Sequence, residues 1–173
     1  MKSKIKFIAF VAASIDGRIA RGKKSGTNWT SREDWNFFQQ ALAKMDAVIV
    51  GRNTYEIAKT KLKRRNTIVL TSQSALKQNG SVTFLNPVKH NLVKFLREKK
   101  HKKVAIVGGG KIYDYCLRHQ MLDELFITIE PYVFTSGVSM FLGKEFKKYP
   151  FMLVSVKKLN KKGSLLLKYK YAG

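Results

Sequence analysis

A run of three glycines, residues 108–110, is the segment of this chain whose composition points most directly to chemistry. The four residues before it are Val-Ala-Ile-Val, an apolar run that predicts a buried strand. After it, apolar residues recur at helical spacing: Ile112, Tyr113, Cys116 and Leu117. A strand, a bare glycine turn and a helix N-terminus direct free N–H groups and the helix dipole at the turn. The segment therefore predicts a phosphate or pyrophosphate site, with Lys111 as a cation at its mouth.

The glycine run taken alone has a second interpretation, a plain tight turn. It lacks the G-x-G-x-x-G spacing of a Rossmann dinucleotide site. It also lacks the G-K-S/T ending of a P-loop. The anion-binding interpretation therefore needs support from other polar groups at the same place in the fold.

Two further predicted strands supply such groups, because they also end in polar or glycine-containing turns. Residues 47–50 lead into residues 51–54, and residues 66–70 lead into residues 71–73. In open α/β sheets, ligands bind outside the carboxyl ends of the strands. Arginine recognises phosphate in a bidentate manner, and hydroxyl groups can donate to it. Four side chains are thus expected beside the glycines: Arg52, Thr54, Thr71 and Ser72.

The hydrophobic pattern predicts the elements that position these turns, in a single domain spanning residues 1–173. Strands are expected at 5–13, 47–50, 66–70, 82–85, 104–107 and 125–133. Pro131 interrupts the last of these, which implies an edge strand or a bulge. Helices are expected from Thr30 or Ser31 to about 44, at 54–59, at 92–99 and from Lys111, with residues 14–30 as a loop.

Near the C-terminus, residues 152–159 and 164–171 alternate in hydropathy and flank a short turn, so they predict an antiparallel hairpin. Earlier in the chain, strands alternate with helices. The expected fold is therefore α/β: a mostly parallel central sheet flanked by helices, closed by the C-terminal antiparallel hairpin.

The charge balance is unusual for a chain of 173 residues with an ordinary apolar fraction of 45%. Thirty-four Lys and Arg against 11 Asp and Glu give a net charge of +23, which attracts polyanions and anionic small molecules. The basic residues are spread over several runs, at 61–65, 99–103, 144–148 and 157–162. No zinc spacing, aromatic RNA platform or helix-turn-helix signature accompanies them. We therefore expect a solvated basic surface rather than a nucleic-acid partner.

Cysteine and histidine usage bounds the chemistry further. Cys116 is the single cysteine, which excludes an internal disulfide and a cysteine metal cluster. His90, His101 and His119 lack metal-ligand spacing. No metal site is expected.

The N-terminus has two interpretations. Lys2, Lys4 and Lys6 precede the apolar residues 7–13, which imitates a secretory signal. The run is short and Asp16 follows closely, which favours a buried first strand. No segment approaches the roughly 20 apolar residues of a membrane span. We expect a cytoplasmic protein without a membrane partner.

Five segments, in this order and spacing, resemble the dihydrofolate reductase superfamily, which includes dihydrofolate reductases and the reductase domain of riboflavin biosynthesis. They are residues 11–20, 51–56, 68–73, 107–113 and 125–128. The resemblance implies an NADPH-dependent oxidoreductase that binds its cofactor across the strand ends. It also implies that the segment between Asp16 and Trp29 is a mobile loop that closes over the nicotinamide.

Positions that match the family's cofactor site follow from this resemblance. Ala12 and Ile19 are expected to line the nicotinamide, with Tyr113 near it. The phosphates are expected to meet Arg52, Asn53, Thr54, Thr71, Ser72, Gly108, Gly109, Gly110 and Lys111.

The resemblance also implies a substrate site. Trp29, Asp34 and Phe38 match the dihydrofolate reductase pattern, in which an acid on the first helix binds the pterin ring. Thr128 is expected to steady that carboxylate. Arg65 falls where the family places an arginine for the glutamate carboxylate of folate.

Four of these residues also have simpler structural interpretations. Asp34 could be a first-turn acid favoured by the helix dipole. Arg65 lies in a basic run, and Phe38 and Tyr113 could be core residues.

The riboflavin-pathway enzyme, a 5-amino-6-(5-phosphoribosylamino)uracil reductase, is the alternative. Residues 12–20 and 28–31 and the terminal hairpin look closer to that branch. At two substrate-side positions the chain departs from it: Val107 replaces a glutamate and Phe10 replaces a lysine. These departures favour dihydrofolate as the substrate, in a monomer or homodimer. A polyanion-binding or nucleic-acid-binding protein on a reductase-like fold is a remote alternative.

Overall fold

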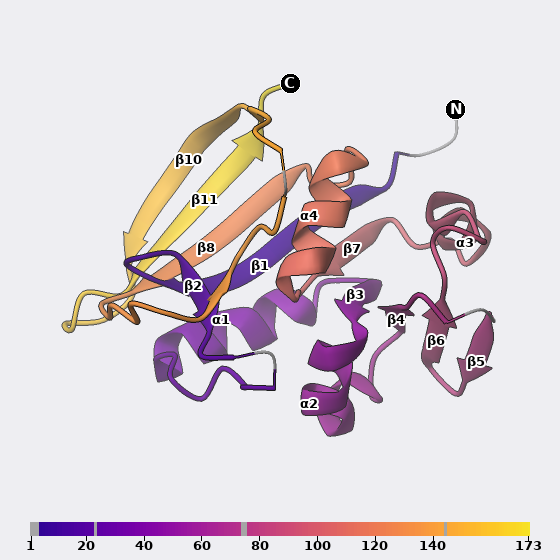
Figure 1. The fold of residues 1–173 in the computed structure, drawn as a ribbon, viewed down its shortest axis with the longest axis horizontal. Helices are drawn as coiled ribbons and strands as arrows, with labels where there is room; N and C mark the ends of the chain where they lie inside the picture. The colour runs from indigo at the N-terminus through magenta and orange to yellow at the C-terminus, as the bar shows by residue number, and fades with distance from the viewer. Residues whose placement is uncertain (1–3, 23, 74–75, 144) are drawn as a thin grey trace.

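Apolar runs form parallel strands at the centre of the fold (Figure 1). The computed structural model describes residues 4–22, 24–73, 76–143 and 145–173. The parallel strands are β1 (Lys6–Ser14), β3 (Ala47–Gly51), β4 (Thr67–Leu70), β6 (Val82–Leu85), β7 (Lys103–Ile106) and β8 (Glu124–Glu130). Most of β3 and β4 is completely buried, as expected for strands covered on both faces.

Antiparallel strands extend this parallel centre on both sides. β11 (Leu165–Tyr171) pairs with β8, and β10 (Phe151–Lys158) pairs with β11, so the predicted hairpin is confirmed. β5 (Lys77–Asn79) pairs with β6 at the other edge. The nine-stranded sheet has the order β10-β11-β8-β1-β7-β3-β4-β6-β5.

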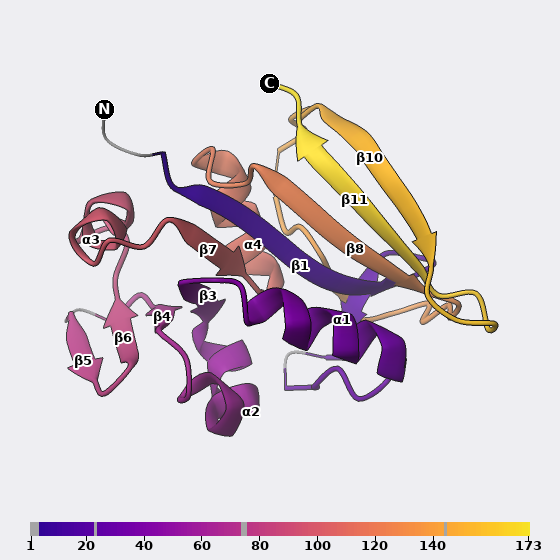
Figure 2. The same cartoon turned by 180° about the vertical axis from the view of Figure 1, so that it is seen from behind.

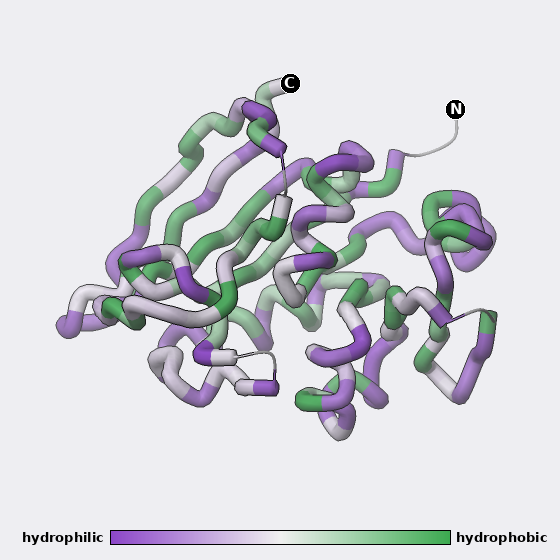
Figure 3. Tube along the Cα trace, viewed as in Figure 1, coloured by the Kyte–Doolittle hydropathy of each residue, from purple (hydrophilic) through white to green (hydrophobic). Residues whose placement is uncertain are grey.

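Helices cover both faces of the sheet, and Figures 1 and 2 show α4 (Gly110–Arg118) and α1 (Arg32–Leu42) on opposite sides. One hydrophobic core packs α4 and α3 (Leu92–Glu98) on the sheet. A second core packs α1 and α2 (Arg52–Leu62) on the other face. Figure 3 shows hydrophobic residues concentrated along the central strands and hydrophilic residues along many connecting segments. The predicted α/β architecture is confirmed.

Local sequence signals account for the helix boundaries. The Ser31 side chain caps α1 by accepting the backbone N–H of Asp34, and Asn91 caps α3 in the same way through Lys94. The helical spacing predicted after the glycine run is confirmed, because Ile112, Tyr113, Cys116 and Leu117 are all buried in α4.

Several boundaries differ from the sequence-based expectation. The second helix begins at Arg52 and extends to Leu62, with a kink at Ala58. The strand predicted to cross Pro131 ends at Glu130 and lies between β1 and β11, so the edge or bulge inferred from Pro131 was wrong. Proline cannot donate to the ladder, and β8 ends just before it.

Short strands were also missed. β2 (Arg18–Ala20) lies inside the expected loop and pairs with β9 (Val138–Ser139) in a separate two-stranded sheet. β5 was also missed, because its residues are exposed and polar.

The basic, apolar N-terminal segment forms the inner strand β1, which confirms the strand interpretation of residues 7–13. Lys2 and Lys144, which belong to the basic runs noted above, lie outside the described residues. Within the described part of the chain, no helix is both long and apolar enough to span a membrane.

Candidate active site

The three predicted turns meet at one edge of the sheet. Gly51 lies opposite Leu70 in the β3–β4 pair, and Ile49 lies opposite Ile106 in the β3–β7 pair. The carboxyl ends of β3, β4 and β7 are therefore level. The Gly51 N–H donates to the Gly108 carbonyl at 2.8 Å, which joins two of the turns directly.

At two of the three glycines of the turn, Gly108 and Gly110, a side chain would force neighbouring atoms to shift. Gly108 has φ +102°, and a Cβ there would lie 3.1 Å from the Tyr113 ring. A Cβ on Gly110 would lie 2.7 Å from the carbonyl oxygen of Ser139. Local packing therefore favours glycine at these two positions. The Gly108–Gly109 peptide bond is cis.

Two helix N-termini converge on this turn, and both have glycine caps. Gly51 caps α2 and Gly109 caps α4, and neither offers a side chain to the first-turn N–H groups. A Cβ placed on Gly109 would lie 3.5 Å from the Thr54 hydroxyl, so the two helix starts are close. Helix starts without side-chain caps are suited to an anion. The arrangement fits the pyrophosphate of a dinucleotide.

The remaining residues predicted for the cofactor lie around this edge. Arg52, Asn53, Ser72 and Lys111 are exposed, and none of them has a side-chain bond among those found in the described part of the chain. The Thr71 hydroxyl accepts the Gln73 N–H at 3.1 Å. These positions leave four polar groups open to solvent and to a ligand.

Three predicted nicotinamide neighbours have different surroundings. Ala12 on β1 is half-buried and pairs with Thr128 on β8. Ile19 on β2 is buried in the core that contains α4. The Tyr113 hydroxyl donates to the Phe10 carbonyl at 2.6 Å, and burial strongly raises the pKa of Tyr113. Tyr113 therefore holds β1 through its hydroxyl and can offer a ligand only its ring.

Asp34 is a buried carboxyl group, only 8% exposed, in the first turn of α1. Its pKa is raised because burial disfavours the charged form, whereas hydrogen bonding to the side chains of Thr128 and Thr30 acts in the opposite direction. The nearby charge of Glu130 raises the pKa further. The structure thus brings together Asp34 and Thr128, as the resemblance implied.

Aromatic side chains lie on the same face of the sheet as Asp34. Phe10 stacks on Phe126 with ring centroids 5.3 Å apart and contacts Phe38 at 6.3 Å. Trp29 packs edge-on against Phe134, and its buried indole N–H has no acceptor among the described residues. An unpaired buried donor is costly, so a ligand or water oxygen at Trp29 fits this wall.

Arg65 lies near the other end of α1 from Asp34, whereas Val107 packs in the same hydrophobic cluster as Phe10 and Phe38. The Arg65 guanidinium donates to Gln39 of α1 at 3.5 Å, so the helix that carries Asp34 also meets Arg65 near its other end. A cavity of about 230 Å³ lies beside Arg65 at the amino ends of β3 and β4, lined by Met45, Asp46, Ala47, Val48, Arg64, Arg65, Asn66 and Ser81. Val107 is half-buried against the core under α1 and α2, and its N–H donates to the Ile49 carbonyl at 3.1 Å.

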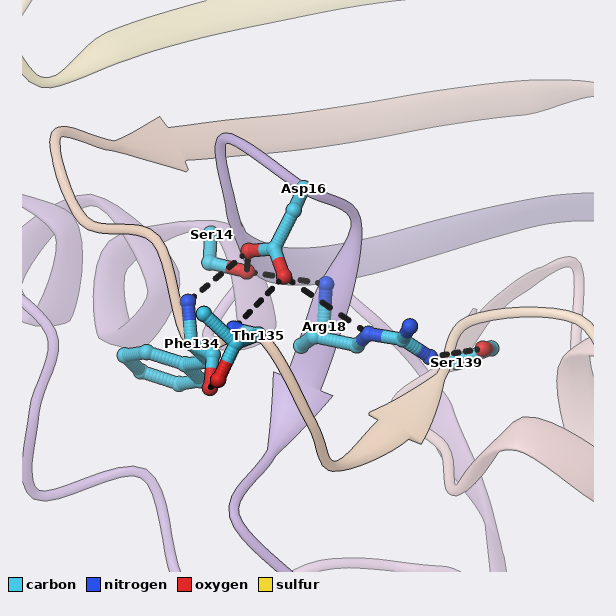
Figure 4. Close-up of polar contacts among 6 residues, drawn as sticks. All are labelled: Ser14, Asp16, Arg18, Phe134, Thr135 and Ser139. Atoms are coloured by element: carbon cyan, nitrogen blue, oxygen red, sulfur yellow. Dashed lines mark hydrogen bonds and ion pairs between the residues drawn. The ribbon is translucent and has the colours of Figure 1, made fainter.

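Asp16 ties the segment after β1 to the segment after β8, as Figure 4 shows. Its carboxylate accepts the Ser14 hydroxyl at 2.6 Å and the backbone N–H groups of Phe134 and Thr135, both at 3.0 Å. The Ser14 hydrogen bond, followed by the one from Phe134, lowers the pKa of Asp16. Arg18 lies 3.7 Å from Asp16 and donates to the Ser139 hydroxyl at 2.8 Å.

Two acidic residues of this region were not predicted from the sequence. Asp16 was used only as a residue that follows the first strand and begins a loop, and Glu130 was not singled out. A glutamate in an otherwise apolar strand was the available signal for Glu130, because such a residue must be paired or functional when buried. Its partners, however, come from distant parts of the chain.

Among the described residues, no group of three or more His, Cys, Asp or Glu side chains is placed to hold a metal ion. Cys116 is buried in α4, and burial raises the pKa of its thiol to about 12. The chemistry of the region is therefore that of carboxyl groups, backbone N–H groups and aromatic walls.

Residues 6–164 match the family described as dihydrofolate reductase. The chain belongs to the dihydrofolate reductase family. The match spans most of the sequence and confirms the resemblance inferred from the five segments. It also confirms the expected class, an NADPH-dependent oxidoreductase.

Two relatives illustrate the similarity. An uncharacterised Bacillus subtilis protein, YwjB, is 28% identical over 144 residues, which cover 79% of this chain and 82% of that protein. A dihydrofolate reductase of Buchnera aphidicola is 28% identical over 124 residues, or 71% of each chain.

Solved structures share the fold at lower identity. A putative riboflavin biosynthesis protein from a Shewanella species has a TM-score of 0.76 at 21% identity, with 98% of this chain and 100% of that chain covered. Dihydrofolate reductase from Enterococcus faecalis, complexed with NADP(H) and RAB-propyl, has a TM-score of 0.67 at 22% identity, with both chains fully covered. Both branches of the superfamily therefore share this architecture.

Proposed function

We propose that the protein reduces dihydrofolate to tetrahydrofolate, with NADPH as the hydride donor. One observation carries the choice of substrate: a buried carboxyl group, Asp34, stands beside Thr128 at an aromatic wall. A pterin ring offers an amide N–H and an amino group, both of which a carboxylate can accept.

Asp34 has two tasks in this proposal. It orients the ring by accepting its two N–H donors, and its negative charge stabilises the cationic character that develops on the ring during reduction. A carboxylate on the pyrimidine edge cannot reach N5, so we expect the proton to arrive there through water. Thr128 holds the carboxyl group in place, and Phe38 and Trp29 supply apolar walls.

The chain's own groups define where the cofactor would bind. The N–H groups at the starts of α2 and α4 face the pyrophosphate, and the bare glycines allow its close approach. Arg52 adds a cation beside the pyrophosphate, and Thr71, Ser72 and Lys111 would pair with the remaining phosphate, on the adenosine 2′ position. Bound NADPH supplies the hydride.

The contact between Arg65 and Gln39 supports folate in particular. This contact holds the Arg65 guanidinium against α1, the helix that also carries Asp34. A ligand bound at Asp34 could therefore extend along α1 to Arg65. The glutamate carboxylate of folate is the natural partner for an arginine.

The riboflavin-pathway uracil reductase is the second candidate. The TM-score of 0.76 with the Shewanella protein, against 0.67 with the Enterococcus enzyme, favours it. Val107 and Phe10 argue for dihydrofolate, because both replace polar side chains of the riboflavin branch. In either case we propose a cytoplasmic enzyme, a monomer or a homodimer, with no nucleic-acid partner.

Activity with each of the two candidate substrates tests this proposal. We expect the purified protein to oxidise NADPH with dihydrofolate and to show a higher melting temperature with methotrexate, because a ligand that binds only the folded state stabilises it by mass action. Arg65→Leu should raise KM for dihydrofolate, whereas the matched control Arg64→Leu should not. Turnover of a phosphoribosylaminopyrimidine with none of dihydrofolate would refute the proposal in favour of the second candidate.

A further inference from the structure

Glu130 is a fully buried acid in the last position of β8, with 1% of its surface exposed. It lies two residues after Thr128, so both side chains project from the same face of the sheet, toward α1. Neither a lysine nor an arginine of the described residues lies within ion-pair distance of it. A buried carboxyl group without a cation is costly and needs hydrogen-bond donors.

Two donors from separate parts of the chain meet this carboxyl group. Glu130 Oε1 accepts the backbone N–H of Ser31 at 2.7 Å. Glu130 Oε2 accepts the hydroxyl of Ser164, which is also buried. Both oxygens are thus occupied by groups that precede other elements: Ser31 caps α1 and Ser164 leads into β11.

Ser31 connects Glu130 to the proposed substrate-binding acid. Its backbone N–H is fixed by Glu130, while its hydroxyl accepts the backbone N–H of Asp34 at 3.2 Å. Asp34 is therefore two hydrogen bonds away from Glu130. The start of α1 cannot move relative to β8 without breaking this connection.

The C-terminal hairpin is held by the same group. Asn160 closes the turn by accepting the backbone N–H groups of Gly163 and Ser164, and it donates to the Ser164 hydroxyl at 2.9 Å. Asn160 also donates to Glu33 at 3.4 Å. The turn between β10 and β11 is thus attached to β8 and to the first turn of α1.

We propose that Glu130 is a positioning residue for Asp34, which clamps the start of α1 and the turn of the C-terminal hairpin against β8. The inference rests on the proposed function only in its kinetic consequence. In the folded protein, one buried carboxylate, that of Glu130, both holds Asp34 in place and supplies a negative charge close to it.

The other charged groups around this pair have partners or face solvent. Asp16 and Arg18, after β1, pair with each other, and Lys168 on β11 pairs with Glu124. The remaining charged side chains of α1 and the hairpin turn near the pair are exposed: Arg32, Glu33, Lys161 and Lys162. The charge of Glu130 is the one that raises the pKa of Asp34, in addition to burial.

The test is a carbon-13 NMR titration of the Asp34 side-chain carboxyl group in the full-length protein, assigned with Asp34→Asn. Glu130→Gln keeps an oxygen for the Ser31 N–H and removes the charge. We expect Asp34 to titrate at lower pH in this variant than in the wild type. Glu124→Gln is the matched control, since Glu124 lies on the same strand but pairs with lysines. It should leave the titration of Asp34 unchanged.

Kinetics provide the second readout. Glu130→Ala removes the clamp, so kcat should fall by about 10- to 100-fold, as expected for a misplaced active-site group. The dissociation constant for NADPH should change much less than kcat, because the turns proposed to bind its phosphates lie at the ends of β3, β4 and β7.

Two outcomes would overturn the inference: an Asp34 titration in Glu130→Gln identical to that of the wild type, or a proportional loss of NADPH binding and turnover in Glu130→Ala. A wild-type protein that binds NADPH but reduces neither candidate substrate would instead refute the proposed function. The NMR titration would still decide the role of Glu130.

Discussion

Asp34 occupies a position that an acid would avoid if only stability mattered. It is buried, it lies near a second carboxyl group, and it has no cation within ion-pair distance among the described residues. Its pKa is raised, mainly by burial. A group whose folded-state pKa exceeds its unfolded value stabilises the protein at low pH and loses this contribution as the pH rises through the folded value. At neutral pH, Asp34 is therefore a cost to stability that a function must justify.

Asp34→Asn should separate that cost from the function. We expect hydride transfer to dihydrofolate to fall by about 10²- to 10⁴-fold, the range typical of a lost proton-transfer or charge-stabilising group. The melting temperature at neutral pH should rise relative to the wild type, and this gain should shrink as the pH falls through the raised folded-state pKa and be absent below the unfolded pKa. Thermal unfolding across a pH series and single-turnover kinetics measure the two effects.

Asp46→Asn is the control for the sign of this effect. Hydrogen bonds from the Lys103 and Lys102 backbones lower the pKa of Asp46, so its replacement should destabilise the protein at neutral pH. An Asp34→Asn variant that is less stable than the wild type at neutral pH would contradict the interpretation of Asp34 as a strained functional acid.

At the scale of elements, the segment after β1, which is expected to cover the proposed nicotinamide site, is held by contacts with residues 134–139. β2 pairs with β9, and Asp16 caps the backbone of residues 134–135 (Figure 4). Both connections join segments more than 100 residues apart in the chain. The loop that closes over the cofactor in the family is therefore coupled here to the segment after β8.

Asp16→Asn should loosen this coupling. An amide offers one acceptor oxygen in place of two, so the hydrogen-exchange protection of the Phe134 and Thr135 N–H groups should fall. Hydrogen bonds from its donors lower the pKa of Asp16. In the wild type, the protection should therefore persist from neutral pH down through the ordinary aspartate range. It should disappear only below that range, as the carboxylate takes up a proton. Exchange measured by NMR at several pH values follows both changes.

Asp123→Asn provides the comparison for this experiment, because Asp123 accepts the Phe7 N–H at the far end of β1. It should leave the exchange of residues 134–135 unaffected. Equal loss of protection in both variants would indicate general destabilisation and would refute a specific role for Asp16.

At the scale of the whole molecule, the +23 charge surrounds a site proposed to bind anionic ligands. The exposed Arg52 and Lys111 at the strand ends belong to this positive surface. A field of this kind raises the rate at which oppositely charged ligands arrive, and salt screens it. It also repels itself, which opposes the compact state.

Salt should therefore act in opposite directions on catalysis and on stability. Raising NaCl from low to near-molar concentration should lower kcat/KM for NADPH by about 10-fold or more, because steering is lost. The melting temperature should rise as repulsion is screened, and the single-turnover rate of the saturated complex should stay constant. A salt-independent kcat/KM would show that the charge plays no part in cofactor capture.

The sequence by itself determined the central strands, the four helices in outline and the family of this protein, but not the short strands β2, β5 and β9. The apolar runs of β1, β3 and β7 and the glycines at 108–110 depend on local pattern and backbone freedom, which neighbouring residues carry. Asp34 and Thr128 were predicted through their place in a known pattern. Their mutual approach is consistent with that expectation.

Only the tertiary structure decided how the site is held together. Glu130 meets Ser31 and Ser164, and Asp16 meets residues 134–135, across gaps of about 30 to more than 100 positions. No periodicity or motif encodes such contacts, because each partner is an ordinary polar residue or a backbone N–H group until the chain has folded. The glycine run predicts the place of an anion site, whereas the closeness of the buried acids Asp34 and Glu130 became visible only when the fold brought β8, α1 and the hairpin together.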